Sequence, residues 1–410
     1  MPAGPPAHVL ALNAGSSSIK FAVFTAGHEL PVVMRGRISG LGSRPLMRVE
    51  RAGEVSETAL DGGRGEGEAE AAFARDFRIA LQALSRLLDA QAMALLAVGH
   101  RVVHGGAQHV APVAVDEAVL ADLGRLISLA PLHEPYALSL IRAMRVRYPE
   151  VPQIASFDTA FHATQPVLET LFALPREFAL RGVRRYGFHG LSYAYVAERL
   201  AAADEPRARQ RTVVAHLGQG ASLCAMVGLR SVATSMGFSA LDGLPMGRRC
   251  GNLDAGVVLH LMQQLGMSVE AVQQLLYERS GLLGVSGLSD DMRELEASAS
   301  EPAREAVALF VHRTNQWLGA LAATMGGLDA LVFTGGIGEN SVAVRAAICR
   351  LAAWLGLAID AGANQDDRMW IQTPESRIAV GIVPTDEERM VARQALEAVT
   401  GPRATSTAHT

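Results

Sequence analysis

The sequence has few cysteines, little net charge and one lysine. Cys224, Cys250 and Cys349 are widely spaced and form no C-x-x-C pair, so we expect neither a disulfide framework nor a zinc knuckle. A reducing cytoplasm is therefore the expected location. The formal net charge of -4 and the pI near 6.3 leave no basic field of the kind that nucleic-acid binding needs. Nucleic acid is not an expected partner.

Long apolar runs are also absent. Residues 1–6 carry no charged segment, and the short apolar stretch that follows them breaks at Asn13. We therefore expect neither a signal peptide nor a membrane-spanning helix, and no membrane partner. With 410 residues, 49% of them hydrophobic and 19% charged, the chain is long enough for two domains.

Lysine is the rarest basic residue. Lys20 is the one lysine among 37 lysines and arginines, and it lies beside a glycine- and serine-rich turn. A biased genome composition explains the scarcity, and the survival of one lysine could then be chance. A compact ammonium also suits phosphate in a tight turn where the fork of a guanidinium does not fit.

The apolar pattern alternates between helical and strand periods. Two short strands, Val9–Leu12 and Phe21–Phe24, flank the first turn. Further strands are expected at 96–103, 152–157, 212–216, 223–227, 330–334 and 377–383, with helices at 71–90, 116–129, 135–147, 193–203, 255–265, 268–279, 302–325, 341–354 and 387–400. This rhythm predicts an α/β fold. Residues 61–70 read as an exposed loop.

The opening pattern recurs in the middle of the chain. Residues 213–227 repeat the order of residues 10–24, a strand, a small-residue turn and a second strand. The repeat hints at internal duplication.

Three turns could hold phosphate. The turn Asn13–Lys20 offers backbone N–H groups, hydroxyls and a cation, but it is not a Walker loop because the motif order differs and a strand follows it. Gly218–Gly220 and Gly335–Asn340 also follow strands, and the second opens a helix whose N-terminus favours an anion. The late glycine turn could also be interpreted as a dinucleotide-binding turn, which would make the protein an NAD-dependent dehydrogenase. That interpretation is weak, because a dinucleotide-binding turn usually lies in the first βαβ unit.

Arginines and histidines cluster in four segments. These are residues 99–104, 156–162, 184–190 and 246–251. Phosphoryl transfer needs cations that hold the equatorial oxygens, a metal and a fixed in-line geometry, which such segments can supply. The histidines of the first segment alternate with valines and are more simply ordinary hydrogen-bonded residues than a metal cluster. Glu387 and Glu388 begin a helix, where they complement its dipole or anchor magnesium.

With these motifs in order, the chain resembles the acetate kinase family, which includes propionate kinases. The match runs from Asn13–Ser18 to Pro384–Glu388. It implies an α/β fold of two duplicated ribonuclease-H-like, actin-like ATPase domains with a cleft between them. The first would span residues 1–155, completed by helix 386–400; the second, for nucleotide binding and dimerisation, would span 156–385; residues 401–410 would be a disordered tail.

The resemblance also implies an activity and its residues. The γ-phosphate of ATP would pass reversibly to acetate by direct in-line attack, with Mg²⁺ or Mn²⁺, in a homodimer. Catalytic roles fall to Arg101, Asp158, His133, His189 and Arg249; Arg101, Val103, Leu132, Phe188 and Ala240 would bind the acid; Asn13 and Glu387 would hold the metal. The phosphates and adenosine of ATP or ADP would contact Asn13, Ser16, Ser18, Lys20, His216, Gly218, Gln219, Gly220, Asp291, Arg293, Gly336, Ile337, Gly338 and Asn340.

The chain departs from the family pattern at Glu134, Gln219, Ala233 and Arg248, where asparagine, asparagine, aspartate and threonine are usual. Ala240 stands where many acetate-specific members carry proline, which leaves room for propionate; one extra methylene changes the binding energy by only ~1–3 kcal/mol. A propionate or butyrate kinase, or a catalytically weak paralogue that binds nucleotide, are the alternatives.

Overall fold

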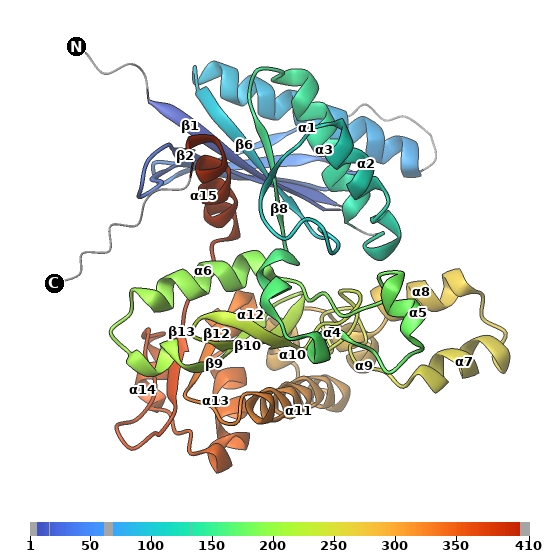
Figure 1. The fold of residues 1–410 in the computed structure, drawn as a ribbon, viewed down its shortest axis with the longest axis vertical. Coiled ribbons are helices and arrows are strands. Elements are labelled where there is room, and N and C mark those ends of the chain that lie inside the picture. The colour runs from blue at the N-terminus through green and yellow to red at the C-terminus, as the bar shows by residue number, and fades with distance from the viewer. Residues whose placement is uncertain (1–5, 16, 61–68, 132, 402–410) are drawn as a thin grey trace. The chain divides into compact units, whose positions relative to one another are not determined.

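The computed structural model describes residues 6–15, 17–60, 69–131 and 133–401 (Figure 1). The chain forms two compact units: the first runs to Ala160 and resumes at Asp386, and the second comprises Phe161–Thr385. The first unit ends a few residues beyond the predicted boundary at 155, because the strand that ends at Phe157 belongs to its sheet. Ser16, Leu132, most of the predicted loop 61–70 and the predicted tail from 402 onward lie outside the described residues.

The first unit is built on an eight-stranded sheet. Its strand order is β5-β4-β3-β2-β1-β6-β8-β7. The strands are β1 (Ala7–Ala14), β2 (Ser18–Thr25), β3 (Val32–Ser39), β4 (Leu46–Arg51), β5 (Glu54–Ala59), β6 (Ala94–Val102), β7 (Val113–Ala114) and β8 (Gln153–Phe157). β1 pairs antiparallel with β2 and parallel with β6, and β6 pairs parallel with β8.

Helices cover both faces of this sheet. The unit contains α1 (Ala69–Ala90), α2 (Glu117–Gly124), the 3₁₀ helix η1 (Ile127–Leu129), α3 (Glu134–Arg147) and α15 (Glu387–Thr400). Apolar residues of α1 and α3 pack with Leu10, Leu12 and Phe21 on one face. α15 packs on the opposite face (Figure 1). There, Val391 lies close to Gly99 of β6.

The second unit is built on a five-stranded sheet with the order β11-β10-β9-β12-β13. Its strands are β9 (Arg211–Leu217), β10 (Ala221–Val227), β11 (Arg230–Thr234), β12 (Ala330–Thr334) and β13 (Ala379–Ile382). Its helices are η2 (Ala160–Thr164), α4 (Val167–Thr170), α5 (Arg176–Leu180), α6 (Gly190–Ala201), η3 (Pro206–Arg209), α7 (Ala255–Gln263), α8 (Val269–Glu278), α9 (Gly281–Ser286), α10 (Met292–Ala297), α11 (Glu301–Thr324), α12 (Gly335–Asn340), α13 (Val342–Leu351), η4 (Ala353–Leu355) and α14 (Ala361–Gln365). Apolar residues of α6 pack with β9, β10, β12 and β13.

The two sheets share a set of five strands with the same topology. In each, three antiparallel strands that follow one another in the chain are joined to two parallel strands at the side of the first strand. β1 and β2 thus correspond to β9 and β10, and β6 and β8 correspond to β12 and β13. The internal duplication suggested by the sequence repeat is a feature of both sheets.

The structure differs from the predicted elements at several places, and β7, β11 and the short helices α4, α5, α9, α10 and α14 were not predicted. The predicted glycine turn at Gly335 is itself a short helix, α12, which starts with Gly335 at a positive φ of 77°. The predicted helix 116–129 divides into α2 and η1. Strands β3 to β5 were not predicted, because β5 is exposed along its whole length and β4 buries one residue.

The helices that the structure describes include no candidate for a membrane span. None of them combines the length and the apolar character that a span requires.

We expect Gly99→Ala to destabilise the first unit. The added Cβ would lie 2.7 Å from Val391 Cγ1 and 2.9 Å from the Val391 carbonyl oxygen, so α15 would have to move. Overpacking of this kind costs about 1–3 kcal/mol. Thermal unfolding should show a lower midpoint, whereas Gly27→Ala, whose Cβ has no neighbour within 4 Å, should not. Equal midpoints would contradict the packing of α15 on β6.

Candidate active site

Charged residues gather at one edge of the first sheet. Because β1, β6 and β8 run parallel, their carboxyl ends share that edge, and Asn13, Arg101 and Asp158 lie there. Asn13 pairs with Lys20 across the β1–β2 ladder. Side chains alternate along a strand, so Arg101 projects to the same face as Gly99, the face that α15 covers.

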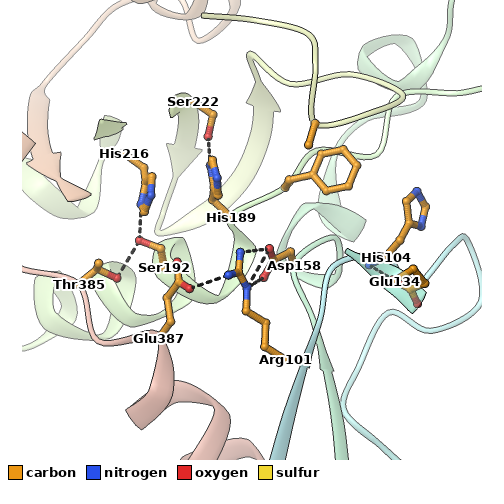
Figure 2. A network of polar contacts seen from close by, with 12 residues as sticks. Arg101, His104, Glu134, Asp158, His189, Ser192, His216, Ser222, Thr385 and Glu387 are labelled. Atoms are coloured by element: carbon orange, nitrogen blue, oxygen red, sulfur yellow. Dashed lines mark hydrogen bonds and ion pairs between the residues drawn. The ribbon is translucent and has the colours of Figure 1, made fainter. Parts of the chain in front are cut away.

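Arg101 is the centre of this group. Its Nε lies 3.1 Å from Asp158 Oδ1 and its Nη2 2.6 Å from Asp158 Oδ2, which is a two-pronged ion pair. Its Nη1 lies 3.4 Å from Glu387 Oε2, in the first turn of α15 (Figure 2). The side chain of Asp158 is 1% exposed and that of Arg101 19%. A buried carboxylate therefore fixes the guanidinium while part of it stays accessible.

Electrostatics keep this cation charged. Burial disfavours the charge on Arg101, but the carboxylates of Asp158 and Glu387 raise the pKa of the guanidinium. The group can therefore serve as a permanent, oriented cation for an anionic ligand.

Glu134, the first of the four departures, is a buried acid with a raised pKa. It is fully buried in α3, and its Oε2 accepts a hydrogen bond from the His104 N–H at 3.3 Å. Burial raises the pKa of Glu134 to about 8. A protonated carboxyl has one donor and one acceptor, as a side-chain amide does, so it can take the place of the family's asparagine. His133, half-buried, is the N-cap residue of α3.

In the second unit, His189 adopts a strained conformation. Its φ of 59° and ψ of 22° lie in the left-handed region, which residues other than glycine rarely adopt. The preceding residue is held in place, because His162 Nε2 donates to the Phe188 carbonyl at 2.9 Å. Burial lowers the pKa of His162 to about 4, so this buried imidazole is neutral. Strain that the surroundings maintain is common at functional sites.

His189 lies against a second histidine and the glycine turn Gly218–Gly220. The His189 and His216 rings stack with centroids 4.4 Å apart (Figure 2). A Cβ at Gly220 would lie 3.0 Å from His189 Nε2 and 3.9 Å from Arg249 Nη1. Arg249 Nη1 in turn donates to the Ala240 carbonyl at 2.9 Å. His189, His216, Gly220, Arg249 and Ala240 thus form one neighbourhood.

A pocket of about 450 Å³ lies next to this turn. Seven of the predicted nucleotide residues line it: Gly218, Gln219, Asp291, Arg293, Gly336, Ile337 and Asn340. Asp290, Met292, Glu296 and Ser341 also line it and were not predicted. Gly338 does not belong to the lining; it packs beneath the turn, where a Cβ would meet the Ala215 carbonyl at 3.5 Å. His216 and Gly220 do not line this pocket either.

Two of the departures meet at the wall of this pocket. Gln219 Nε2 donates to the Asp290 carbonyl at 3.3 Å, and Arg248 Nε donates to the Asp290 carboxylate at 2.6 Å. The longer amide and the extra cation therefore hold the same residue from two sides. Ala233 is a buried position in β11, paired with Ala225.

A buried arginine that the sequence did not single out supports α12. Arg345 is fully buried; its Nη1 donates to the carbonyls of Gly338 and Glu339, and its Nε donates to Asn364 Oδ1 at 2.7 Å. Glu339 Oε1 accepts from the Gly335 and Thr385 N–H groups at 2.8 and 3.0 Å. The glycine-rich wall of the pocket is thus held at both ends.

Comparison with known proteins identifies the family. The profile of the Acetokinase family matches residues 8–393. The chain belongs to the acetokinase family. It is 48% identical over 404 residues to an acetate kinase of Rhodopseudomonas palustris, covering 96% of this chain and 99% of that protein. An acetate kinase of Methylocella silvestris is 48% identical over 395 residues, 95% of this chain and 97% of that one.

Solved structures of the acetokinase family agree with the fold. A propionate kinase of Francisella tularensis superposes with a TM-score of 0.83 at 34% identity, over 95% of this chain and 98% of that one. An acetate kinase of Porphyromonas gingivalis gives 0.82 at 35% identity, over 95% and 99%. The predicted two-domain α/β, actin-like ATPase fold is confirmed, and the chain is an enzyme, a kinase of this family.

We expect Glu134→Gln to remove a pH dependence of stability. The folded carboxyl, with a pKa of about 8, binds its proton more tightly than the unfolded one, whose ordinary value is 4.5. Its contribution is complete below pH 4.5 and is lost as the pH rises through about 8, by up to about 1.4 kcal/mol per pH unit. The free energy of unfolding of the variant relative to wild type should therefore increase from pH 5 to pH 8.

The control for this measurement is Glu150→Gln, which removes an exposed carboxylate. It should leave the pH dependence of stability unchanged. A constant difference between Glu134→Gln and wild type over this range would show that Glu134 is ionised in the folded protein.

Proposed function

We propose that this protein transfers the γ-phosphate of ATP reversibly to the carboxylate of acetate, giving acetyl phosphate and ADP. The observation that carries the proposal is the Arg101 guanidinium, oriented by buried Asp158 at the edge of the sheet where Asn13 and Lys20 also lie. An oriented cation of this kind suits a carboxylate or a phosphoryl group in transfer. The named relatives, acetate kinases at 48% identity, support the choice of acid.

The reaction we propose is one in-line displacement. An oxygen of the acid attacks the γ-phosphorus, the bond from that phosphorus to the bridging oxygen breaks, and ADP leaves with the electron pair. A general base is not required, because a carboxylate is ionised at neutral pH. Arg101 orients the acid, Arg249 and His189 offset charge on the phosphoryl oxygens, and Asp158 positions Arg101. His133 is a further charge-stabilising group.

Nucleotide contacts follow the predicted set. The pocket residues Gly218, Gln219, Asp291, Arg293, Gly336, Ile337 and Asn340 would hold the adenosine end, with Gly220 and His216 toward the phosphates. Asn13, Ser16, Ser18 and Lys20 would contact the phosphates that react, and Val103, Leu132, Phe188 and Ala240 the alkyl group of the acid.

The donors present fit a magnesium ion. Glu387 supplies one partly exposed carboxylate and Asn13 one amide, and groups of three or more ligating side chains are absent from the described residues. Mg²⁺ typically binds through one or two carboxylates and completes its shell with water and substrate phosphates. Glu387 and Asn13 would hold it, and it would supply charge neutralisation on the ATP phosphates.

Propionate is the second candidate acid. The Ala240 carbonyl accepts a hydrogen bond from Arg249 Nη1, and the alanine side chain is smaller than the proline of many acetate-specific members, which would leave more space for the acid. The relative of known structure that is named a propionate kinase, at 34% identity, points the same way. We also infer a cytoplasmic location, because Cys224, Cys250 and Cys349 are all free.

A coupled ADP-release assay across acids of two to four carbons tests the proposal. We expect Mg²⁺-dependent turnover with kcat/KM highest for acetate, and a loss of roughly 100-fold or more in Arg101→Gln, since removal of one charge-stabilising donor typically costs that much. Arg304→Gln, an exposed arginine of α11, serves as the control. Propionate favoured more than tenfold would change the assigned substrate, and nucleotide binding without acyl phosphate formation would indicate the catalytically weak paralogue.

We further propose that the protein is a homodimer formed through its second unit. Helix α7 buries none of its residues. Large apolar side chains are exposed on it and on the following segment: Val257, Leu259, Met262, Leu265 and Val269. Such a surface is typical of a protein interface, and a second copy is the partner we propose.

Light scattering after size exclusion tests this proposal. We expect twice the chain mass of 43.4 kDa for wild type and a monomer for Leu259→Glu, because a charge replaces an apolar contact. Leu351→Glu, at an exposed leucine of α13, should remain dimeric. A monomeric wild type at micromolar concentration would rule the dimer out.

A further inference from the structure

A chain of three buried groups reaches His189 from behind. Tyr193 of α6 and Ser222 of β10 are both fully buried, and the Tyr193 hydroxyl bonds to Ser222 Oγ. Ser222 Oγ lies 2.8 Å from His189 Nδ1 (Figure 2). The other ring nitrogen, Nε2, faces the Gly218–Gly220 turn, as the close approach to Gly220 indicates. The chain therefore ends on the side of the imidazole away from that turn.

The Tyr193 hydroxyl determines which atoms donate in this series of hydrogen bonds. Burial raises the pKa of Tyr193 well above its ordinary value, so the phenol keeps its proton. Among the described residues, Ser222 is the one hydrogen-bond partner of that phenol, so Tyr193 donates to Ser222. The single hydrogen of Ser222 then points to His189 Nδ1, which must accept it.

The tautomer of His189 follows. A neutral imidazole that accepts at Nδ1 carries its hydrogen on Nε2. The opposite tautomer would donate from Nδ1 to Ser222, which already receives the Tyr193 hydrogen; the hydrogen of Ser222 would then have no acceptor. An unsatisfied buried hydroxyl is unfavourable, so these hydrogen bonds favour the Nε2–H tautomer of His189.

We propose that Tyr193 and Ser222 are positioning residues that fix His189 as an Nε2–H donor toward the transferred phosphoryl group. This inference rests on the proposed function. The alternative tautomer would present a lone pair to anionic phosphoryl oxygens and repel them. The Nε2–H tautomer donates a hydrogen bond that becomes stronger as charge develops on those oxygens.

The same arrangement is repeated for the stacked neighbour. Thr385 Oγ1 donates to Ser192 Oγ at 2.8 Å, and Ser192 Oγ lies 2.8 Å from His216 Nδ1. Ser192 and Tyr193 are consecutive residues of α6, and Ser222 pairs with His216 across the β9–β10 ladder. Serines on α6 and on β10 thus contact Nδ1 of the two imidazoles: Ser192 contacts His216, and Ser222 contacts His189. The groups that can carry charge around His189 are His216 on β9, Tyr193 on α6 and Arg249.

The test combines turnover with a direct view of the tautomer. The full-length protein is labelled with ¹⁵N-histidine, and the two-bond proton–nitrogen correlations of His189 are assigned by their absence in His189→Gln. We expect the Nε2–H pattern in wild type. Ser222→Ala removes the donor to Nδ1, so the single Nε2–H pattern should give way to a mixture of the two tautomers. We expect kcat to fall about 10- to 100-fold with KM for ATP within about twofold.

Tyr193→Phe is a second, independent variant. It should keep the Nε2–H pattern, because the hydrogen of Ser222 still has Nδ1 as its acceptor, and it should lower kcat less than Ser222→Ala does. The control for Ser222→Ala is Ser376→Ala, a buried serine of the same unit whose hydroxyl accepts from Ala358 N and donates to the Ile378 carbonyl; spectrum and kcat should match wild type. A pure Nε2–H pattern and wild-type kcat in Ser222→Ala would overturn the inference. Absence of acid-dependent turnover in wild type would instead overturn the proposed function, because the spectrum reports the tautomer without turnover.

Discussion

The parallel pairing of β1 with β6, and of β9 with β12, is the constraint on which the site depends. Parallel strands end at the same edge of a sheet, so residues far apart in the chain must meet there. In the first unit this edge collects Asn13, Arg101 and Asp158; in the second it joins the Gly218–Gly220 turn to the start of α12. Duplication of one topology therefore gives each unit an edge at which polar residues or glycine turns meet.

Buried polar groups then give each edge its orientation. Asp158 holds Arg101, Arg345 holds the carbonyls at the end of α12, and Ser222 holds His189. Each of these groups loses its water on folding, so it is tolerated only where its hydrogen bonds are satisfied. This requirement makes the supporting side chains as specific as the residues that would touch substrate.

The sequence was sufficient for what depends on local pattern. Buried strands such as β1, β9 and β12 have continuous apolar runs. Motif order identified the family and seven of the residues that line the pocket beside the Gly218–Gly220 turn. It could not reveal β5, whose exposed residues leave no apolar period, or Arg345, Glu339 and Asp290, whose partners are distant in the chain. Arg248 looked anomalous in the motif because its carboxylate partner, Asp290, lies in another segment.

Lys20 has a consequence for chemical labelling. It is the one lysine of the chain, it is exposed on β2, and it lines a small pocket with Arg35, Arg37 and Arg48. An ε-amino group at a single place means that an amine-selective dye or crosslinker, apart from the α-amino terminus, reacts at the edge of the first sheet alone. A fluorophore attached there reports on the strand pair that begins at Asn13, without a cysteine having to be engineered into the protein.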